Sequence, residues 1–409
     1  MVGGLVMDKG TFDFSSFIAE RVPPATAATT TGWDPRGRPK YDFGTGFPDP
    51  DSFPAEGLHE ALGQALKERG REMVLYPDPK GFLEFREFIV DKLHRERGIV
   101  VEPDQVLVTG GSGVALAIFT QLLSNPGDTL ITEEFTYPGT LSVMRNLKAN
   151  IVGVSTDEEG MRPDVLDETI RNLKSKGIHP KFVYTIPSFQ NPTGTDMSVQ
   201  RRHDILTVAQ NHGVPIFEDD AYEDLRFEGD RTPSIHSYDD TKMTLYCGTF
   251  SKIIAPGMRI AYLVVPPELI SQTNFLNWGR PTSHFAALAT YYYLRDHMDE
   301  HVAEVNDILL AKRDTMIGAL GEFMDPKVVY NRPSGGMYLW AQLPEGISVA
   351  SVAGKARERG VAYLPGPNFS PTGEGENYLR LCFGYADHEG IRDGIALLSQ
   401  IFTEEGLLA

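Results

Sequence analysis

The sequence predicts an α/β fold, with a large domain built on a mainly parallel sheet of the seven-stranded type and a smaller α+β domain. Between about residues 57 and 265, short apolar runs typical of strands alternate with runs of helical periodicity. Strands that alternate with helices favour a parallel sheet covered by helices on both faces. After about residue 285 the pattern changes to two helical runs, followed by mixed strands and helices.

The pattern divides the chain into three segments. Residues 1–40 are rich in Pro, Gly, Thr and Ala, which predicts an extended arm with at most one short helix, over 14–20. We assign 1–45 to this N-terminal arm and part of the small domain. Residues 46–290 form the large domain, and 291–409 form the small C-terminal domain.

The elements of the large domain follow in order along the chain. Helices are predicted over 57–69, 81–97, 114–123 and 200–211. Strands are predicted over 105–109, 128–132, 151–155, 182–186, 215–218, 245–250 and 260–265. In the small domain, the pattern predicts helices over 285–295, 301–323, 349–359 and 389–402, and strands over 336–341 and 378–383. Because ligands collect at the carboxyl ends of strands in such sheets, the residues after each strand are the candidates for a site.

Composition and charge argue against several classes of function. The formal net charge of −18 disfavours a nucleic-acid surface, because binding a phosphate backbone requires clustered Lys and Arg. The two cysteines, Cys247 and Cys382, lie in apolar runs without metal-ligand spacing, so we expect buried free thiols and no metal site. We find no signal peptide and no apolar run of membrane-spanning length, and we expect a cytoplasmic protein without membrane contact.

Two turns after predicted strands could bind a ligand. Residues 110–113 (GGSG) stand between a strand and a helix, where backbone N–H groups and the helix N-terminus favour a phosphate. The turn lacks the spacing of a dinucleotide-binding loop or a P-loop, and a plain tight turn explains it equally well. In residues 189–194 (FQNPTG), Asn191 falls at the sheet rim and could donate to a ligand oxygen, although a turn is again the simpler interpretation.

Charged residues mark three further strand ends. The acids of residues 218–222 (EDDAY) follow a buried-type strand and point toward the ligand crevice, with helix capping as the alternative. Lys252 follows an apolar strand among Phe250 and two isoleucines, and such a site lowers the pKa of a lysine and makes its amine a nucleophile. Most lysines are instead solvated surface residues. Arg380, inside the apolar run YLRLCF, requires an anion, which is either an internal carboxylate or a ligand carboxylate.

Taken in order, the motifs NPTG, EDDAY, SKIIAPGMR, GGMYLW and YLRLCF resemble the class I/II aminotransferases of pyridoxal 5′-phosphate (PLP) fold type I. The resemblance looks strongest to the branch of aminoadipate and kynurenine aminotransferases. It extends from residues 43–46 (FGTG) to the last predicted helix. Each motif is weak alone, and the order and spacing of the set make the resemblance specific. The large domain is then expected to be the PLP-binding domain.

The resemblance implies the catalytic roles. Lys252 matches the lysine that holds PLP as a Schiff base and then moves the proton between substrate and cofactor. Asp219 matches the acid that pairs with the pyridine nitrogen, whereas Asp220 fits less well because the family's tyrosine stands three residues after that acid. Tyr222 and Asn191 match the donors to the cofactor's phenolic oxygen.

The resemblance also implies the binding roles. The cofactor phosphate is expected to be held by Ser112, Gly113, Thr249, Ser251 and Arg259. Tyr137 matches the aromatic residue that stacks on the ring. Tyr76 matches a tyrosine that reaches the phosphate of the neighbouring subunit, which implies a homodimer with shared active sites; a core tyrosine is the alternative. The substrate carboxylate is expected at Arg380, with Gly46 and Asn191 nearby.

The sequence departs from the family pattern at three places: residues 112–114 (SGV), Ala261 and Ala287. Because of these departures, the sequence does not predict the pocket for the substrate side chain. It also does not predict the roles of Arg280 and His284. We predict an aminotransferase of amino acid metabolism, acting in a biosynthetic process, that moves an amino group between an L-amino acid and a 2-oxo acid.

Two alternatives to this reaction stay open. The first is another PLP reaction on the same scaffold, namely that of a lyase, cyclase, oxidase or carbon–carbon bond-forming synthase. The second is an effector domain of a transcription regulator, which the acidic chain disfavours. The identities of the amino donor and acceptor are not predicted.

Overall fold

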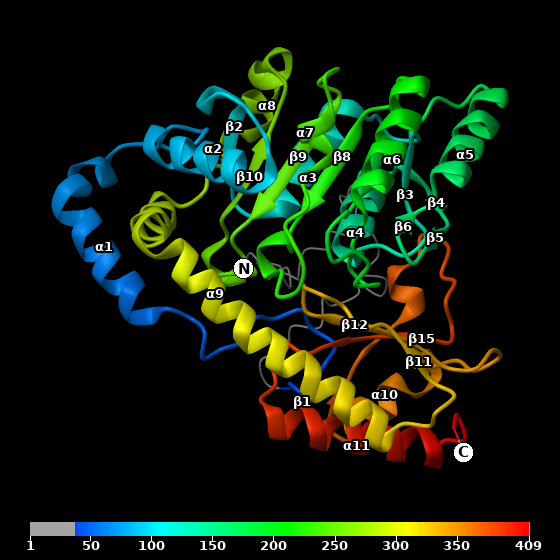
Figure 1. Cartoon of the computed structure of the whole chain (residues 1–409). Helices are drawn as coiled ribbons and strands as arrows, with labels where there is room; N and C mark the ends of the chain where they lie inside the picture. Colours follow the sequence, from blue (N-terminus) through cyan, green and yellow to red (C-terminus); the bar gives the residue numbers. More distant parts are fainter. Residues whose placement is uncertain (1–36, 409) are drawn as a thin grey trace, which may run out of the picture.

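The structure is a computed structural model that describes residues 37–408. A seven-stranded sheet and its helices form one part of the molecule, and a four-stranded sheet with two helices forms the other (Figure 1). The long helix α9 (His284–Phe323) runs along both parts. Residues 1–36 of the predicted arm, with the predicted helix over 14–20, lie outside the described residues.

The large sheet confirms the predicted α/β class. Its strand order is β2-β10-β9-β8-β7-β3-β4, and its neighbours are parallel except where β10 pairs with β2 and β9. The strands are β2 (Val106–Thr109), β3 (Thr129–Glu133), β4 (Asn150–Val154), β7 (Val183–Thr185), β8 (Ile216–Asp220), β9 (Thr244–Thr249) and β10 (Ala261–Val264). Every residue of β2, β3, β7, β8, β9 and β10 is buried, which explains why these strands form continuous apolar runs in the sequence.

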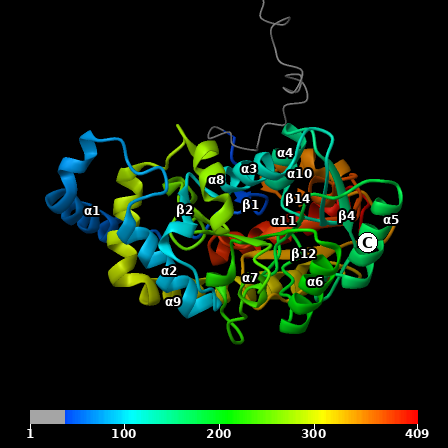
Figure 2. The same cartoon turned by 90° about the horizontal axis from the view of Figure 1, so that it is seen from above.

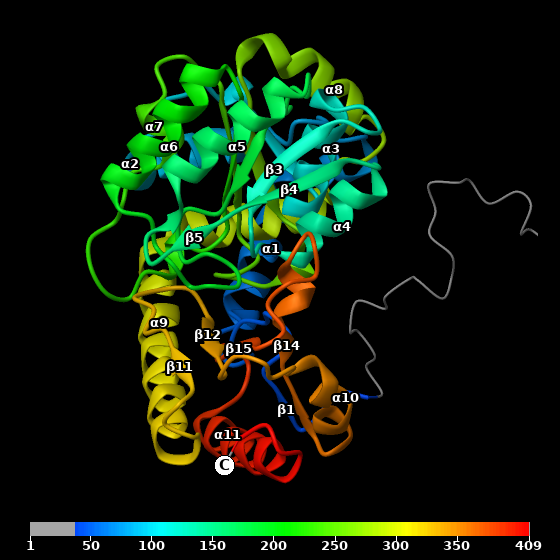
Figure 3. The same ribbon diagram turned by 90° about the vertical axis from the view of Figure 1, so that its right-hand side faces the viewer.

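Helices cover both faces of this sheet (Figures 2 and 3). One face carries α3 (Ser112–Leu123), α4 (Pro138–Asn146) and α8 (Ile270–Asn277). The other carries α2 (Leu83–Arg97), α5 (Pro163–Ser175), α6 (Val199–His212) and the short α7 (Ile235–Tyr238). A small hairpin of β5 (Thr156–Asp157) and β6 (Gly160–Met161) follows β4.

The smaller part contains an antiparallel sheet of order β11-β12-β15-β14. Its elements are β11 (Val329–Tyr330), β12 (Tyr338–Gln342), β14 (Leu364–Pro365), β15 (Tyr378–Cys382), α10 (Ala350–Glu358) and α11 (His388–Glu404). Near the start of the described chain, β1 (Tyr41–Asp42) pairs with β13 (Val361–Ala362), and α1 (Ala55–Arg69) packs on α9. Because β1 joins this part, the residues directly after it pass between the two sheets.

The prediction of two helices over 285–295 and 301–323 is wrong, because α9 is continuous over its 40 residues. Residues 296–300 carry three acids, but no Gly or Pro interrupts the helix there. Met298 and His301 continue the buried stripe of the helix, and the imidazole Nε2 of His301 lies 2.6 Å from the carbonyl oxygen of Ile253. The predicted boundary between residues 290 and 291 therefore falls inside a helix. Among residues 37–408, no helix is long and apolar enough to span a membrane.

Candidate active site

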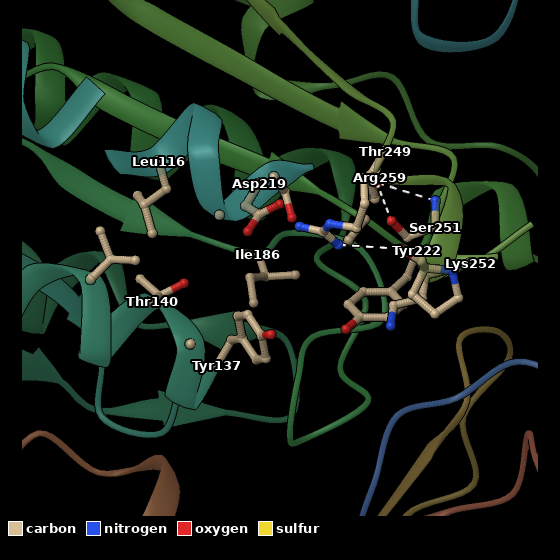
Figure 4. A pocket seen from close by; sticks show the side chains of 16 residues that line it. Leu116, Tyr137, Thr140, Ile186, Asp219, Tyr222, Thr249, Ser251, Lys252 and Arg259 are labelled. Atoms are coloured by element: carbon tan, nitrogen blue, oxygen red, sulfur yellow. Dashed lines mark hydrogen bonds between the residues drawn. The ribbon is translucent and has the colours of Figure 1, made fainter. Parts of the chain in front are cut away.

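A cavity of about 320 Å³ lies at the carboxyl end of the large sheet (Figure 4). Its walls are the segments that follow β2, β3, β7, β8 and β9, as the parallel topology requires. Nine of the residues predicted for the site line it, namely Ser112, Gly113, Tyr137, Asp219, Tyr222, Thr249, Ser251, Lys252 and Arg259.

One end of the cavity is suited to an anion. Ser112 and Gly113 open the 12-residue helix α3, whose first N–H groups have no partner within the helix. Gly111 precedes them at φ 104°, and a Cβ placed on it would lie 2.3 Å from Nη2 of Arg259. The guanidinium therefore fits against the turn only because residue 111 is glycine. The hydroxyl of Thr249 donates to that of Ser251 over 2.9 Å on the same side (Figure 4).

Lys252 lies in the wall of the cavity, and its Nζ donates to the carbonyl oxygen of Gly46 over 2.8 Å. Burial lowers the pKa of Lys252 to about 8. The positive charges of Arg380 and Arg259 act in the same direction, whereas Cys382 and Asp219 oppose them. A much larger fraction of the amine is therefore uncharged near neutral pH than in an unshifted lysine, and the uncharged form is the nucleophile.

The two neighbouring acids of β8 point to opposite faces of the sheet, since side chains alternate along a strand. Asp219 faces the cavity, where its Oδ2 accepts a hydrogen bond of 2.5 Å from Tyr184 and its buried Oδ1 has no hydrogen-bond partner. Burial raises the pKa of Asp219 to about 6. Asp220 instead forms an ion pair of 2.6 Å with Arg97 and accepts a hydrogen bond from Tyr246.

A second group of residues adjoins the cavity through a hydrogen-bonded chain. Nη1 of Arg380 donates to Oδ1 of Asn191 over 2.7 Å, and Nδ2 of Asn191 donates to the hydroxyl of Tyr222 over 3.1 Å. Arg380, on β15, lies over the rings of Tyr338 and Phe369, with its Cζ 4.2 and 5.0 Å from their centroids. Its Nε is buried without a partner. The small sheet thus contributes Arg380 and Tyr338, and segments that follow strands of the large sheet contribute Asn191 and Tyr222.

Tyr76 is the predicted site residue that this chain does not bring to the cavity. It follows the short helix η2 (Gly70–Val74) and is fully exposed, with a relative exposure of 102%. The sequence does not predict the roles of Arg280 and His284. Arg280 is exposed, the imidazole Nε2 of His284 lies 3.4 Å from the carboxylate of Glu72, and neither residue lines the cavity.

The sequence interpretation missed three polar residues of the site: Thr140, Tyr184 and Tyr338. Thr140 lines the cavity, Tyr184 contacts Asp219, and the hydroxyl of Tyr338 lies 3.2 Å from that of Tyr222. Two of these are tyrosines in apolar strands. A buried tyrosine hydroxyl needs a hydrogen-bond partner, and that signal was present in the sequence.

The chemistry of the cavity fits PLP. Arg259 and the N–H groups of Ser112 and Gly113 provide donors for a phosphate, and the unpartnered Oδ1 of Asp219 can accept a hydrogen bond from a protonated ring nitrogen. The amine of Lys252 lines the same cavity. Among residues 37–408, no three His, Cys, Asp or Glu side chains gather as metal ligands. Fold and site together define a PLP enzyme of fold type I.

Comparison with known proteins identifies the family. The family described as aminotransferase class I and II matches residues 38–396. The aromatic-amino-acid aminotransferase 1 of Thermococcus litoralis is 34% identical over 88% of this chain and 87% of its own length. The chain therefore belongs to the aminotransferase class I and II family, and it is a PLP-dependent aminotransferase.

Solved structures agree with this assignment and with the predicted branch. The kynurenine aminotransferase of Pyrococcus horikoshii, in complex with PMP, superposes with a TM-score of 0.85 at 33% identity, covering 90% of this chain and 91% of that one. The alpha-aminoadipate aminotransferase of Thermus thermophilus, complexed with N-(5′-phosphopyridoxyl)-L-leucine, gives 0.83 at 32% identity, covering 90% and 92%.

Proposed function

We propose that the chain transfers an amino group between an L-amino acid and a 2-oxo acid, with Lys252 as the point of covalent cofactor attachment. The observation that carries this proposal is that the buried amine of Lys252 lines the same cavity as Asp219, which Arg380 adjoins through Asn191 and Tyr222. When bound, PLP supplies an electron sink that makes the substrate Cα–H bond acidic. Nζ of Lys252, once free, takes the proton from Cα and returns it to the cofactor side.

The other residues orient the reactants in this proposal. Asp219 holds a proton at the ring nitrogen through Oδ1, and Tyr222 and Asn191 donate toward the phenolic oxygen. Tyr137 stacks on the ring. The phosphate is held by the N–H groups and side chains that meet at one end of the cavity, namely Ser112, Gly113, Thr249, Ser251 and Arg259.

Arg380 is proposed to bind the substrate α-carboxylate. Its guanidinium is already oriented by Asn191, by the carbonyl oxygen of Gly44 and by two aromatic rings, while Nε stays unpartnered. A planar fork held in this way suits a carboxylate, which arginine binds through two parallel hydrogen bonds. Gly46 adjoins the same place through Lys252.

We further propose a homodimer with shared active sites. Val74, Leu75 and Tyr76 expose 85%, 67% and 102% of their surface in this chain. The contact of His284 with Glu72 places the start of α9, with the half-exposed Phe285, next to them. Apolar surface of this kind is typical of a protein interface, and a second copy would cover it and bring its Tyr76 to the neighbouring cavity. A cytoplasmic location also stays a proposal, supported by two buried free thiols.

The half-reaction tests transamination against the alternative PLP reactions. The holoenzyme is mixed with one amino acid at a time, beginning with aromatic amino acids, 2-aminoadipate and kynurenine because relatives act on them. The expected result is the matching 2-oxo acid and the amino form of the cofactor in equal amounts. Release of ammonia with oxygen consumption, or release of carbon dioxide, would contradict the proposal.

Lys252→Ala tests the attachment point. The variant should lose the visible absorbance of the covalently held cofactor, and borohydride treatment should leave no cofactor mass on the protein. Lys176→Ala, at an exposed position after α5, is the control and should behave as the parent protein. Covalent cofactor in the Lys252→Ala variant would refute the assignment.

A further inference from the structure

Two tyrosine–aspartate pairs lie side by side in the large sheet, and only one of them faces the cavity. Tyr184 on β7 donates to Oδ2 of Asp219 over 2.5 Å, and Tyr246 on β9 donates to Oδ2 of Asp220 over 2.6 Å. Both tyrosines are at most 2% exposed. The pairs are thus similar in burial and in the hydrogen bond from tyrosine, and they differ in the face of the sheet and in the ion pair that Asp220 also forms with Arg97.

The pair at Asp219 continues into a longer chain. The hydroxyl of Thr140, at the start of α4, donates to the hydroxyl of Tyr184 over 2.9 Å. Because the tyrosine oxygen accepts this bond, its own proton is directed to Asp219. The ring of Tyr184 is held by stacking on Phe217, with centroids 5.8 Å apart and an interplanar angle of 18°. The donor therefore has little freedom to turn away from the carboxylate.

Because of this chain of hydrogen bonds, the two carboxylate oxygens of Asp219 have different surroundings. Oδ2 is occupied by Tyr184, while Oδ1 is buried, without a partner, on a residue that lines the cavity. We propose that Tyr184, oriented by Thr140, is a positioning residue that holds the Asp219 carboxylate in its ionised form and directs Oδ1 at the cofactor ring nitrogen.

Other charges near Asp219 make such a donor necessary. Burial raises the pKa of Asp219, and so do the negative charges of Asp220 and Glu133, whereas the Tyr184 hydrogen bond and Lys252 lower it. Tyr137 and Cys247 also face the carboxylate. The hydrogen bond from Tyr184 is, after burial, the largest of these influences. Without it, a larger fraction of Asp219 is protonated at mildly acidic pH and cannot accept a proton from the ring.

The inference rests on the proposed role of Asp219, and the experiment separates the two. The cofactor dissociation constant of the holoenzyme is measured from pH 5.5 to 9 for the parent protein and for Tyr184→Phe, Tyr246→Phe, Thr140→Val and Asp219→Asn. A hydrogen bond to a charged group is worth about one to two pKa units. Since the pKa of Asp219 is about 6, Tyr184→Phe should therefore weaken cofactor binding by about fivefold to fiftyfold at pH 6, with the difference vanishing by about pH 9.

Tyr246→Phe is the matched control, and two substitutions of Thr140 test the other end of the hydrogen-bonded chain. Tyr246→Phe removes a matched hydrogen bond from the acid that faces away from the cavity, so its profile should follow the parent. Thr140→Val should shift the profile in the same direction as Tyr184→Phe by a smaller amount, and Thr140→Ser should restore it. A merely structural role for Tyr184 would weaken binding equally at every pH.

The outcomes distinguish the two ideas. If Tyr184→Phe follows the parent or Tyr246→Phe while Asp219→Asn loses the cofactor, the positioning role is refuted and the role of Asp219 stands. If Asp219→Asn binds the cofactor as the parent does, the proposed site itself is wrong. If Tyr184→Phe fails to fold, Thr140→Val decides, and a profile identical to that of the parent refutes the inference.

Discussion

At the residue scale, burial shifts two ionisable groups of the cavity in opposite directions. It raises the pKa of Asp219 to about 6 and lowers that of Lys252 to about 8, because a charge in an enclosed site loses its hydration whichever its sign. Between these values the acid is ionised and part of the amine is neutral. The proposed roles require an ionised Asp219 carboxylate and a neutral Lys252 amine, and both forms are populated near neutral pH.

The pKa of Lys252 predicts how the rate of covalent PLP binding to the apoprotein depends on pH. Only the neutral amine attacks the cofactor aldehyde, and a lysine with an unshifted pKa would be neutral only near pH 10. With a pKa of about 8, the rate at which apoprotein regains PLP should rise through pH 7–9 and level off above it. Stopped-flow absorbance measures this rate. A midpoint near pH 10 would contradict the lowered pKa.

The proposed role of Arg380 predicts that its substitution weakens substrate binding and leaves cofactor binding unchanged. Arg380→Lys keeps the charge but loses the planar fork, so the KM for the amino acid should rise by about tenfold or more. The visible spectrum of the holoenzyme should change little, because the proposed phosphate and ring contacts are intact. A raised cofactor dissociation constant with an unchanged KM would indicate that Arg380 serves the fold instead.

At the element scale, the start of α3 and the segment after Lys252 form one structure. Arg259, itself at φ 55°, lies in the space left by the missing side chain of Gly111. The departure of residues 112–114 from the family pattern leaves this geometry unaffected, since a phosphate at a helix N-terminus is bound by backbone N–H groups. Glycine before that helix is therefore the sequence feature on which the anion site depends most.

Gly111→Ala tests this dependence against a matched glycine. Gly127 also has a positive φ, of 90°, but a Cβ there meets nothing within 4 Å. Both alanine variants should lose about 1 kcal/mol of unfolding free energy from backbone strain. Only Gly111→Ala should also displace Arg259 and weaken PLP binding, by about tenfold, as measured by cofactor titration. Equal cofactor affinities in the two variants would contradict the proposed phosphate site.

At the scale of the whole molecule, the candidate active site draws residues from both sheets. Arg380 comes from the small sheet, Lys252 and Asp219 come from the large one, and Gly46 comes from the segment between them. The division of the chain into domains stays a prediction. Helix α9 crosses the proposed boundary. If the two parts move relative to each other, this helix must therefore bend or move together with one of them.

The exposed apolar residues after α1 predict the oligomeric state. Val74→Asp places a charge in the proposed interface, where burial without a partner is costly, and should convert a dimer to a monomer with reduced activity. Val329→Asp, on β11, is the matched control because it is also exposed, at 66% against 85% for Val74. Sedimentation velocity reports the masses. A parent protein that sediments as a monomer would refute the dimer.

The extent to which the sequence predicts the fold depends on how local each signal is. All seven strands of the large sheet are recognisable, and six of them are buried along their whole length and therefore form continuous apolar runs. Helices α4, α5, α7 and α8 fall outside the predicted set. Three of them, α4, α7 and α8, have nine residues or fewer, too short for a clear helical period. Helix α5 has 13 residues and a proline at its start, so its signal was present in the sequence and was overlooked. The break predicted within α9 arises because acids on its surface interrupt the apolar pattern without interrupting the helix.

The sequence by itself determined the α/β class and named Lys252, Asp219 and Arg380 as candidates, since each is a charged residue at the end or in the interior of an apolar strand. Only the tertiary structure decided which groups meet. It placed Asp219 in the cavity and Asp220 behind it, and it joined Tyr184 to Asp219 from a neighbouring strand. The reason is physical: burial and hydrogen bonding between strands depend on register and strand order, which no local pattern contains.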